Sequence, residues 1–378
     1  MIDFTAWVGD GFTGRSRPVG YVLGVSTTPP APPERILIIR PSALGDVCRS
    51  VCVLASLRGA FPNARIDWLV QDSFGAAIGA HPMLTRAIPF PRREVALGKL
   101  WTGAGRRRLG SFLASLRHPG DGGGYEMVFD CQGLGRSGLF AWWTQAKRRV
   151  GYANAREMGW LGVNARHRVP LEMHGVDRML ALVEREGITP VRDMRLYVNE
   201  EDAANLDPRL RGAAYAVVAP TSRWPGKRWP AERFAKLISA LLDTGGIDNV
   251  VIVAGPSERD QCGPILQLAA REPRIVDQIG RTSVGELMAI VRGARLVVAN
   301  DSAPLHMAVG FDRPLVGLFG PTRIDLVGPY QREADVIQAY EPAPGISHKN
   351  DSAGRKMMEA ITLERVIHAC QERLDPKL

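Results

Sequence analysis

The sequence predicts an α/β protein made of two doubly wound, Rossmann-like domains that face each other across a cleft. Two observations support this fold class. Short apolar runs, each typical of a buried parallel strand, alternate with segments of helical periodicity along most of the 378 residues. Polar turns follow several of these runs, and doubly wound folds bind their ligands where the carboxyl ends of parallel strands meet. The pattern therefore predicts the position of a site as well as the fold.

The apolar runs predict five strands in each half of the chain, with amphipathic helices between them. In the first half the expected strands are residues 36–40, 65–70, 87–90, 127–130 and 149–152. In the second half they are residues 215–219, 250–254, 274–277, 296–300 and 315–319. Helical periods are clear at 176–186, 231–242, 283–292 and 305–310.

The break between the two domains is expected in the charged stretch 197–211, which contains Pro208. We therefore predict domains at 34–198 and 199–345, followed by a C-terminal loop and helix at 346–378. The helix in this last segment, at about 363–373, is expected to pack back on the first domain. Residues 1–33 are rich in Gly, Pro, Ser and Thr, and their short apolar stretch has no basic flank before it. They are expected to be a flexible extension, not a signal peptide.

Composition and charge limit the classes of function. Apolar content of 45% and charged content of 23% are typical of a globular protein, and no apolar stretch approaches the roughly 20 residues of a membrane span. Five scattered cysteines without metal-binding spacing favour a reducing cytoplasm. From residue 34 to 195 the chain has 24 basic and 14 acidic residues, whereas the remainder after 195 has 22 and 23. A half of charge +10 beside a half of charge −1 suggests that the two halves bind different ligands.

The segment that follows the expected strand 296–300 predicts an anion site. Asp301 and Ser302 precede a helix with Pro304 in its first turn, which is typical of a capped helix N-terminus. Free backbone N–H groups and the helix dipole at such a place attract phosphate. The next expected strand also ends in a polar turn, at Gly320-Pro321-Thr322. The predicted ligand is a phosphate and, with the motifs described next, a nucleotide diphosphate.

Three further polar turns follow expected strands. The first strand is followed by Gly45 and Asp46 at a helix start, where Asp46 is either only a helix cap or a catalytic carboxylate. In the second half, hydroxyl side chains and a lysine precede a helix and could hold phosphate oxygens, and an acidic residue after the next strand could bind ribose hydroxyls. These residues are Thr221, Ser222, Lys227 and Glu258.

Taken together, these motifs resemble those of the ADP-heptose:lipopolysaccharide heptosyltransferases, glycosyltransferase family 9. The resemblance covers about residues 35–374, and the matching segments are 42–46, 130–134, 227–230, 255–258, 301–306 and 320–322. Within the family, the first half is most similar to heptosyltransferase I, which adds the first heptose to Kdo. The segments that carry this finer similarity are 90–93, 132–137, 155–157 and 174–178.

The resemblance implies a GT-B fold and an inverting glycosyl transfer with ADP-heptose as donor substrate, without a bound metal or other cofactor. Asp46 would be the general base on the acceptor hydroxyl, and Lys227 would balance the charge of the departing diphosphate. Glu258 would hold the ribose, and Asp301 the hydroxyls of the heptose. The remaining donor-binding residues implied are Thr221, Ser222, Ser302, Ala303, Leu305 and His306.

The same resemblance assigns the acceptor to the basic first domain, 34–198, and the nucleotide sugar to the second, 199–345. The acceptor would be an acidic lipid-linked saccharide, either Kdo-lipid A or the heptosylated core. The residues implied to face it are Arg92, Arg93, Arg136, Arg156, His174 and Arg178. The protein is therefore expected in the cytoplasm, peripheral at the inner face of the inner membrane, and nucleic acid is not an expected partner.

Other readings of the sequence remain open. A member of the same family could use another nucleotide sugar or acceptor. An NAD-dependent dehydrogenase shares the fold class, but the turn after the first strand lacks two glycines of the Gly-x-Gly-x-x-Gly motif. A non-catalytic nucleotide-binding protein would keep the phosphate-binding turns and would not need Asp46.

Overall fold

The computed structural model describes residues 31–99, 101–120, 123–342 and 351–375. Nearly all of the predicted extension 1–33, and most of the loop predicted before the last helix, lie outside these ranges. Residues Pro33–Leu378 form one compact unit. Because this unit is not divided further, the domain boundaries expected at 198 and 345 stay a prediction.

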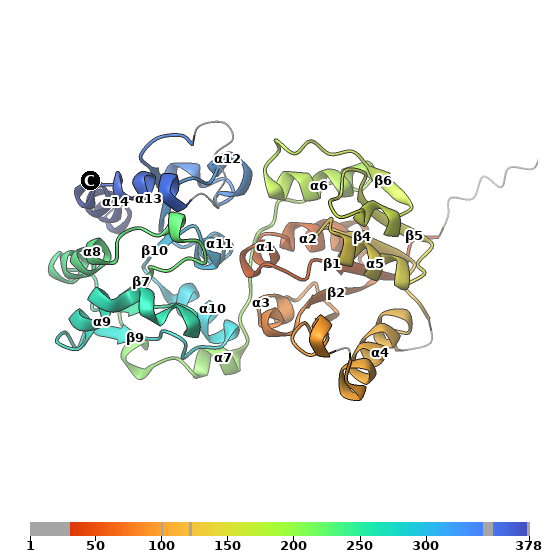
Figure 1. The fold of residues 1–378 in the computed structure, drawn as a ribbon, viewed down its shortest axis with the longest axis horizontal. Coiled ribbons are helices and arrows are strands. Elements are labelled where there is room, and N and C mark those ends of the chain that lie inside the picture. The colour runs from red at the N-terminus through yellow and green to blue at the C-terminus, as the bar shows by residue number, and fades with distance from the viewer. Residues whose placement is uncertain (1–30, 100, 121–122, 343–350, 376–378) are drawn as a thin grey trace, which may run out of the picture. The chain divides into compact units, whose positions relative to one another are not determined.

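The first half of the chain forms a parallel six-stranded sheet (Figure 1). Its strands are β1 (Arg35–Ile39), β2 (Arg65–Gln71), β3 (Arg86–Phe90), β4 (Met127–Asp130), β5 (Arg148–Tyr152) and β6 (Ala165–His167). They are arranged in the order β3-β2-β1-β4-β5-β6. The chain reverses its direction of winding between β1 and β4, and this point is where doubly wound folds open a crevice for ligands.

The second half forms another parallel six-stranded sheet with the same topology, in the order β12-β11-β10-β7-β8-β9. Its strands are β7 (Tyr215–Ala219), β8 (Asn249–Ile252), β9 (Ile275–Asp277), β10 (Leu296–Asn300), β11 (Leu315–Phe319) and β12 (Val336–Gln338). Here the winding reverses between β7 and β10. The predicted class of two doubly wound domains is therefore confirmed.

All ten predicted strands are present, with ends within two residues of the predicted ones. Strands β6 and β12, each at an edge of its sheet, were not predicted. Each has three residues, and β6 has the sequence Ala-Arg-His. Neither contains an apolar run long enough to be recognised as a strand.

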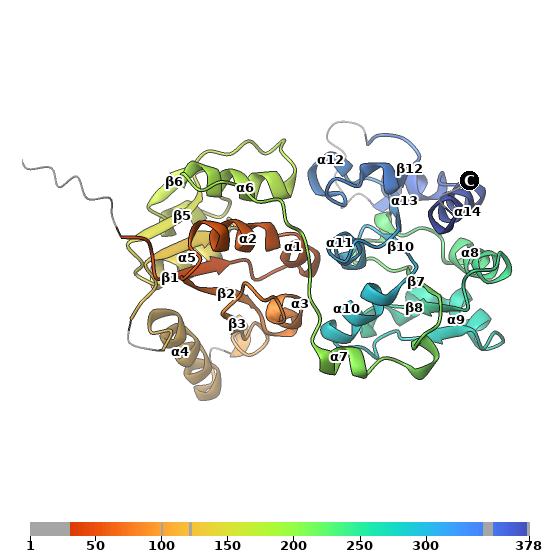
Figure 2. The same ribbon diagram turned by 180° about the vertical axis from the view of Figure 1, so that it is seen from behind.

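Helices cover both faces of the first sheet. They are α1 (Leu44–Cys48), α2 (Val51–Ala60), α3 (Ala76–Gly79), α4 (Gly103–Arg117), α5 (Gly135–Trp143) and α6 (Gly175–Arg185). Ile36 and Ile38 of β1 are buried in the cluster that includes α2 and α6, and Leu37 and Ile39 in the cluster with α4 and α5. Helices α2 and α6 lie side by side in both ribbon views (Figures 1 and 2). Burial on both faces explains why the strands are continuous apolar runs.

The helices of the second half are α7 (Glu200–Ala204), α8 (Ala231–Asp243), α9 (Gly263–Ala269), α10 (Val284–Gly293), α11 (Ala303–Gly310), α12 (Ile324–Val327), α13 (Asp351–Glu359) and α14 (Leu363–Leu374). The prediction that α14 packs on the first domain is wrong. Helix α14 lies beside α8 (Figure 1). Its Val366 and Cys370 are buried in one cluster with Phe234 and Leu237 of α8. The apolar stripe of α14 predicts that one face of the helix is buried, but it does not specify which part of the protein that face packs against.

One cluster of buried apolar side chains includes residues from both sheets, among them Ile38 and Trp68 from the first and Val297 and Ala299 from the second. The segment between α6 and α7 is bonded to the second half, since the Leu196 N–H donates to the carbonyl of Gly310, 2.9 Å away. In the described part of the chain, no helix has the length and apolar character needed to cross a membrane.

Candidate active site

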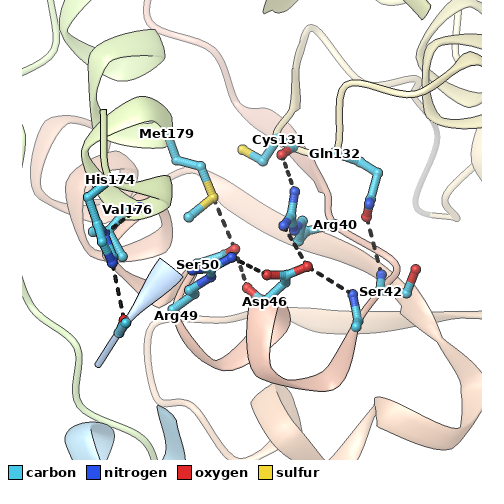
Figure 3. Close-up of polar contacts among 12 residues, drawn as sticks. Arg40, Ser42, Asp46, Arg49, Ser50, Cys131, Gln132, His174, Val176 and Met179 are labelled. Carbon is cyan, nitrogen blue, oxygen red and sulfur yellow. Dashed lines mark hydrogen bonds and ion pairs between the residues drawn. The ribbon is translucent and has the colours of Figure 1, made fainter. Parts of the chain in front are cut away.

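The turns after β1 and β4 meet at the point where the first sheet reverses its winding. The Ser42 N–H donates to Gln132 Oε1, 3.3 Å away, and Arg40 Nη1 donates to the carbonyl of Cys131, 2.6 Å away (Figure 3). Two turns that are about 90 residues apart in the sequence are thus joined by hydrogen bonds. These bonds hold in place the turns next to Asp46, which lies in the first turn of α1.

Asp46 is the third residue of α1, and Ala43 occupies the N-cap position. Its carboxylate accepts the Ala43 N–H at 3.2 Å. Asp46 therefore does help to cap the helix, as considered from the sequence, but it does so from the third position of the helix and not from the N-cap position. The same carboxylate forms ion pairs with Arg40 Nη2, at 3.0 Å, and with Arg49 (Figure 3). The Asp46 side chain stays 27% exposed, which leaves room for a ligand to reach it.

The two arginines determine the protonation state of Asp46. Burial alone would raise its pKa, but the charges of Arg40 and Arg49 and the hydrogen bonds from Arg49 and the Ala43 N–H outweigh burial. The pKa of Asp46 is therefore held well below its usual range. Neither arginine was predicted from the sequence as a site residue. Arg49 was accessible to such an analysis, because it lies three residues after Asp46 on a predicted helix.

A cavity of about 400 Å³ adjoins Asp46. Arginine side chains dominate its charge, since Arg40, Arg49, Arg156 and Arg178 all line it. The Nε atoms of Arg40, Arg49 and Arg178 are buried and have no hydrogen-bond partner among the described residues. A buried N–H group without a hydrogen-bond partner is costly, and an anion bound in the cavity would supply the missing acceptor, so the cavity is suited to carboxylate or phosphate groups.

Three other predicted acceptor residues, Arg92, Arg93 and Arg136, do not line this cavity. Arg92 donates to Gln71 Oε1 at 3.1 Å, and the Arg136 guanidinium lies 5.5 Å from the centre of the Phe90 ring. Arg92 and Arg136 line a second, smaller cavity of about 30 Å³. Arg93 is exposed and belongs to the lining of neither cavity. The structure therefore brings Arg156 and Arg178 to Asp46, and Arg92 and Arg136 to the neighbouring cavity.

His174 has a different environment from the one expected. It is the N-cap of α6, where its Nδ1 accepts the Val176 N–H, and its Nε2 donates to the carbonyl of Gly328 at 3.1 Å. Burial lowers the pKa of His174, and a neutral ring with the proton on Nε2 satisfies both bonds. Both nitrogens are thus used within the protein (Figure 3), and contact with an acceptor stays a prediction.

In the second half, Asn300 connects the turns that follow β7 and β10. Its buried side chain donates to the carbonyl of Pro220 at 2.6 Å and accepts the Trp229 N–H at 3.1 Å. These bonds fix the segment that carries Lys227, whose Nζ lies 2.6 Å from Asp301 Oδ2. The side chains of Lys227 and Asp301 are 13% and 11% exposed. The two residues predicted to bind diphosphate and heptose are therefore paired with each other.

The other predicted donor residues lie beside this pair. Glu258 Oε2 accepts the Thr221 hydroxyl at 2.8 Å and the Gly255 N–H at 3.0 Å. The Ser222 N–H donates to Gln261 Oε1 at 3.3 Å. Thr221, Ser222 and Glu258, which are up to 37 residues apart, thus form one polar group at the carboxyl edge of the second sheet.

The N-terminus of α11 is less fully capped than the sequence predicted. The hydroxyl of Ser302 turns back to the carbonyl of Asn300, 3.0 Å away, and makes no capping bond. The Leu305 N–H donates to the carbonyl of Ser302 at 3.2 Å, so its expected role toward phosphate would require that bond to open. Thr322 in the next turn has a buried hydroxyl without a partner among the described residues. The hydroxyl of Thr322 is therefore available to a ligand at this edge of the sheet.

Helices α1 and α11 are in contact, which brings the two candidate groups together. A Cβ atom on Gly45 would lie 2.6 Å from His306 Cδ2, so only glycine allows this approach. His306 is 9% exposed, and burial, together with the nearby charge of Arg49, lowers its pKa to about 4. The ring is neutral at neutral pH. His306 connects the Asp46 helix with the Asp301 turn and carries no charge of its own there.

The class of protein is shown by its similarity to known proteins. A solved structure of Escherichia coli heptosyltransferase WaaC with ADP-2-deoxy-2-fluoro heptose has the same fold, with a TM-score of 0.70 and 23% sequence identity, covering 89% of this chain and 99% of that chain. The fold is GT-B, and the chain is a glycosyltransferase, as the sequence predicted. The dehydrogenase and the non-catalytic nucleotide-binding protein are thereby set aside.

The family follows from the sequence match. Residues 114–356, more than half of the chain, match glycosyltransferase family 9 (heptosyltransferase), and the chain belongs to this family. Lipopolysaccharide heptosyltransferase 1 of Escherichia coli K12 is 26% identical over 331 residues, covering 86% of this chain and all of the relative. Lipopolysaccharide heptosyltransferase 2 of the same strain is 26% identical over 326 residues, covering 80% and 88%. Equal identity to the two types leaves the choice between them open.

Proposed function

We propose that this protein transfers heptose from ADP-heptose, with inversion, to an acidic lipid-linked saccharide of the lipopolysaccharide inner core. The observation that carries the proposal is Asp46, a partly exposed carboxylate beside a cavity lined by four arginines. A carboxylate there can accept a proton, and the arginines suit an anionic acceptor. The names of the relatives, which are lipopolysaccharide heptosyltransferases, support the same class of reaction.

In the proposed reaction the acceptor hydroxyl attacks the anomeric carbon of the heptose from the face opposite the diphosphate. The new C–O bond forms as the bond to the diphosphate oxygen breaks, and its electron pair leaves with ADP. The hydroxyl proton passes to the carboxylate of Asp46. One base on the acceptor side is enough for this path, since no glycosyl-enzyme intermediate forms.

The low pKa of Asp46 would make it a weak base in the free protein, and the acceptor can correct this. Arg40 and Arg49 are the charges that lower the pKa. Carboxylate or phosphate groups of the acceptor that pair with these arginines would neutralise part of that charge, so the pKa of Asp46 would rise toward a value useful for catalysis. Proton abstraction would then be efficient only with the correct acceptor in place.

On the donor side, the ion pair of Lys227 with Asp301 is proposed to exchange partners. The diphosphate would take the ammonium group of Lys227, which leaves the carboxylate of Asp301 for the hydroxyls of the heptose. Negative charge grows on the diphosphate in the transition state, and a fixed ammonium and helix N–H groups stabilise it there. The proposal assigns this role to Lys227 and the start of α11, with no metal or other cofactor.

The proposed acceptor is Kdo-lipid A or the heptosylated core, met at the cytoplasmic face of the inner membrane. The test is to incubate the purified protein with ADP-heptose and each acceptor separately and to weigh the lipid product by mass spectrometry. A heptose added to Kdo-lipid A alone would assign the first transfer, and one added only to the heptosylated core would assign the second. ADP-glucose in place of ADP-heptose tests the sugar. Transfer of glucose at the same rate would overturn the assigned donor.

A further inference from the structure

A group of exposed apolar side chains lies on α5 and the adjoining 3₁₀ helix Gly159–Gly162. Among the described residues eight large hydrophobic side chains are exposed, and four of them belong to this region. They are Leu139 (53% exposed), Trp142 (47%), Met158 (66%) and Leu161 (57%), which we call the apolar platform. Monomeric proteins rarely leave such side chains clustered on the surface without a partner.

The two elements of the platform are held rigidly together. A Cβ atom on Gly138 would lie 2.1 Å from the carbonyl oxygen of Gly159, and one on Gly162 would lie 1.8 Å from that of Gly138. Glycines on both sides therefore allow the helices to touch through their backbones. Leu139 and Trp142 are three residues apart on α5 and share one helix face. The backbones that carry the platform are thus held together by direct contact.

Basic residues lie close to the platform residues along the chain. Residues 135–147 and 156–166 contain four basic side chains, Arg136, Lys147, Arg156 and Arg166, and one acidic side chain, Glu157. All four basic residues are exposed, and the Arg166 guanidinium lies 5.0 Å from the ring of Trp160, beside Leu161. An apolar centre with a basic rim is complementary to a bilayer that contains anionic lipids.

The platform also adjoins both candidate acceptor cavities. Leu134, Arg136 and Ser137, at the start of α5, line the smaller cavity, and Arg156 lines the larger one beside Asp46. A lipid-linked acceptor would have its saccharide in these cavities and its acyl chains in the bilayer beside them. The position of the platform therefore suits a protein that takes its acceptor directly from a membrane surface.

From these observations we infer that the apolar platform and its basic rim dock this protein on an anionic bilayer. The inference rests on the proposed function for its biological meaning, but binding to vesicles can be measured without donor or acceptor. Burial of Leu139, Trp142, Met158 and Leu161 at the lipid boundary supplies the apolar part of the affinity, and the basic rim supplies the part that depends on salt.

The chain offers a selective probe of this contact. All five cysteines are buried, so a new surface cysteine can be labelled alone. Leu139→Cys with an environment-sensitive fluorophore should shift to the blue on addition of phosphatidylglycerol vesicles and be quenched by spin-labelled lipids. Tyr340→Cys, at a site of similar exposure (51%) in the second half, should not respond. Equal responses at the two sites, or no response at either, would overturn the inference.

Vesicle sedimentation of the full chain measures the contribution of the platform. The double variant Trp142→Ser/Leu161→Ser should bind phosphatidylglycerol vesicles at least about tenfold more weakly, whereas Tyr340→Ser should stay within about twofold of wild type. Lys147→Gln and Arg166→Gln should each weaken binding about fivefold. Added salt and neutral phosphatidylcholine vesicles should reduce binding of the wild type. A double variant that binds as well as wild type would refute the docking surface.

Two controls separate this inference from its rivals. Sedimentation velocity of wild type and of the double variant should give the same mass; a dimer that the variant dissociates would assign the platform to self-association instead. With a detergent-dispersed acceptor the double variant should keep kcat and KM, and with the acceptor in vesicles its KM should rise. A wild type that binds vesicles but transfers no heptose would refute the proposed function and leave the docking surface standing.

Discussion

At the scale of single residues, the site depends on how charges are paired. Asp46 is held between Arg40 and Arg49, and Lys227 is held by Asp301, so each residue proposed to act in the transfer begins in an ion pair. Side chains that are held in this way are already oriented, which lowers the cost of organising the transition state. Substrate groups that replace one member of each ion pair would free Asp46 and Lys227 to act in the transfer.

Asp46→Asn should abolish most transfer and leave ADP affinity nearly unchanged. The amide cannot accept the acceptor proton, and loss of a general base typically lowers the rate by roughly 10²–10⁴-fold. Asp46 lies after β1, whereas the predicted nucleotide residues follow β7, β8 and β10. Calorimetric titration with ADP and a transfer assay on the same sample measure the two effects. Turnover at the wild-type rate would refute the role of base.

Glu258→Gln and Lys227→Ala should affect the donor in different ways. Glu258 accepts the Thr221 hydroxyl and is proposed to hold the ribose, remote from the bond that breaks, so Glu258→Gln should raise the donor KM with little change in kcat. Lys227→Ala should raise KM and lower kcat, because its charge acts on the diphosphate in both states. Steady-state kinetics over a range of donor concentrations separates the two. A fall in kcat alone for Glu258→Gln would rule out the ribose role.

At the scale of elements, the helix starts place these residues, and glycines set how closely the helices approach. Gly45 brings α1 against His306 of α11, and Gly138 brings α5 against the 3₁₀ helix Gly159–Gly162. At both positions a residue larger than glycine would place its Cβ atom too close to the neighbouring element. These glycines therefore determine the arrangement of the elements around the cavities.

Gly138→Ala should destabilise the protein, whereas Gly110→Ala should stabilise it. At Gly138 a Cβ atom would lie 2.1 Å from a backbone oxygen that cannot rotate away, so we expect a loss of roughly 2 kcal/mol or more. At Gly110, inside α4, nothing lies within 4 Å of an added Cβ, and alanine should add about 0.5–1 kcal/mol. Urea unfolding of both variants measures the change. Equal stabilities would contradict the tight contact.

At the scale of the whole molecule, buried ionisable groups make stability depend on pH. His306 has a pKa lowered to about 4, because burial disfavours its charged form. Asp130, which is buried among the N–H groups of Gln132 and Gly133, has a pKa raised to about 6, also chiefly by burial. The two shifts act in opposite directions between pH 4 and 6.

His306→Gln should make the protein less sensitive to acid. The unfolded chain gains a proton on His306 near pH 6.5 and the folded chain only near pH 4, so this group stabilises above pH 6.5 and that contribution is lost as the pH falls toward 4. Between pH 7.5 and pH 5 the expected loss is about 2 kcal/mol. Urea unfolding of wild type and variant at both pH values measures it; Asp130 is common to both and cancels. Identical pH slopes would refute the assignment.

The uneven charge of the molecule predicts how salt acts on each substrate. Neutralising Arg92, Arg136 and Arg156 together should raise the acceptor KM, and raising the salt concentration from about 0.05 M to about 0.5 M should raise it further in the wild type. Donor affinity should stay nearly constant, since the second half has a net charge of −1. Acceptor kinetics of wild type and triple variant across the salt series decide the matter. Flat and superimposable curves would exclude the basic half from acceptor binding.

The sequence by itself determined ten of the twelve strands of the described structure, the topology class and the family. Buried parallel strands are apolar throughout, so runs such as 215–219 and 296–300 were located at their observed bounds. The turns that follow them carry Asp46, Lys227, Glu258 and Asp301, and ligands of doubly wound sheets bind at that edge. Local patterns were sufficient for these predictions because each depends on residues that are close together along the chain.

Only the tertiary structure decided which of these residues meet and which surface each helix covers. Arg40 and Arg49 became site residues because they lie against Asp46, and His174 was found bonded to Gly328, 154 residues away. The surface beneath α14 was decided in the same way. Contacts between distant segments depend on how complete elements pack, and an amphipathic pattern records only that a face is buried, not what buries it.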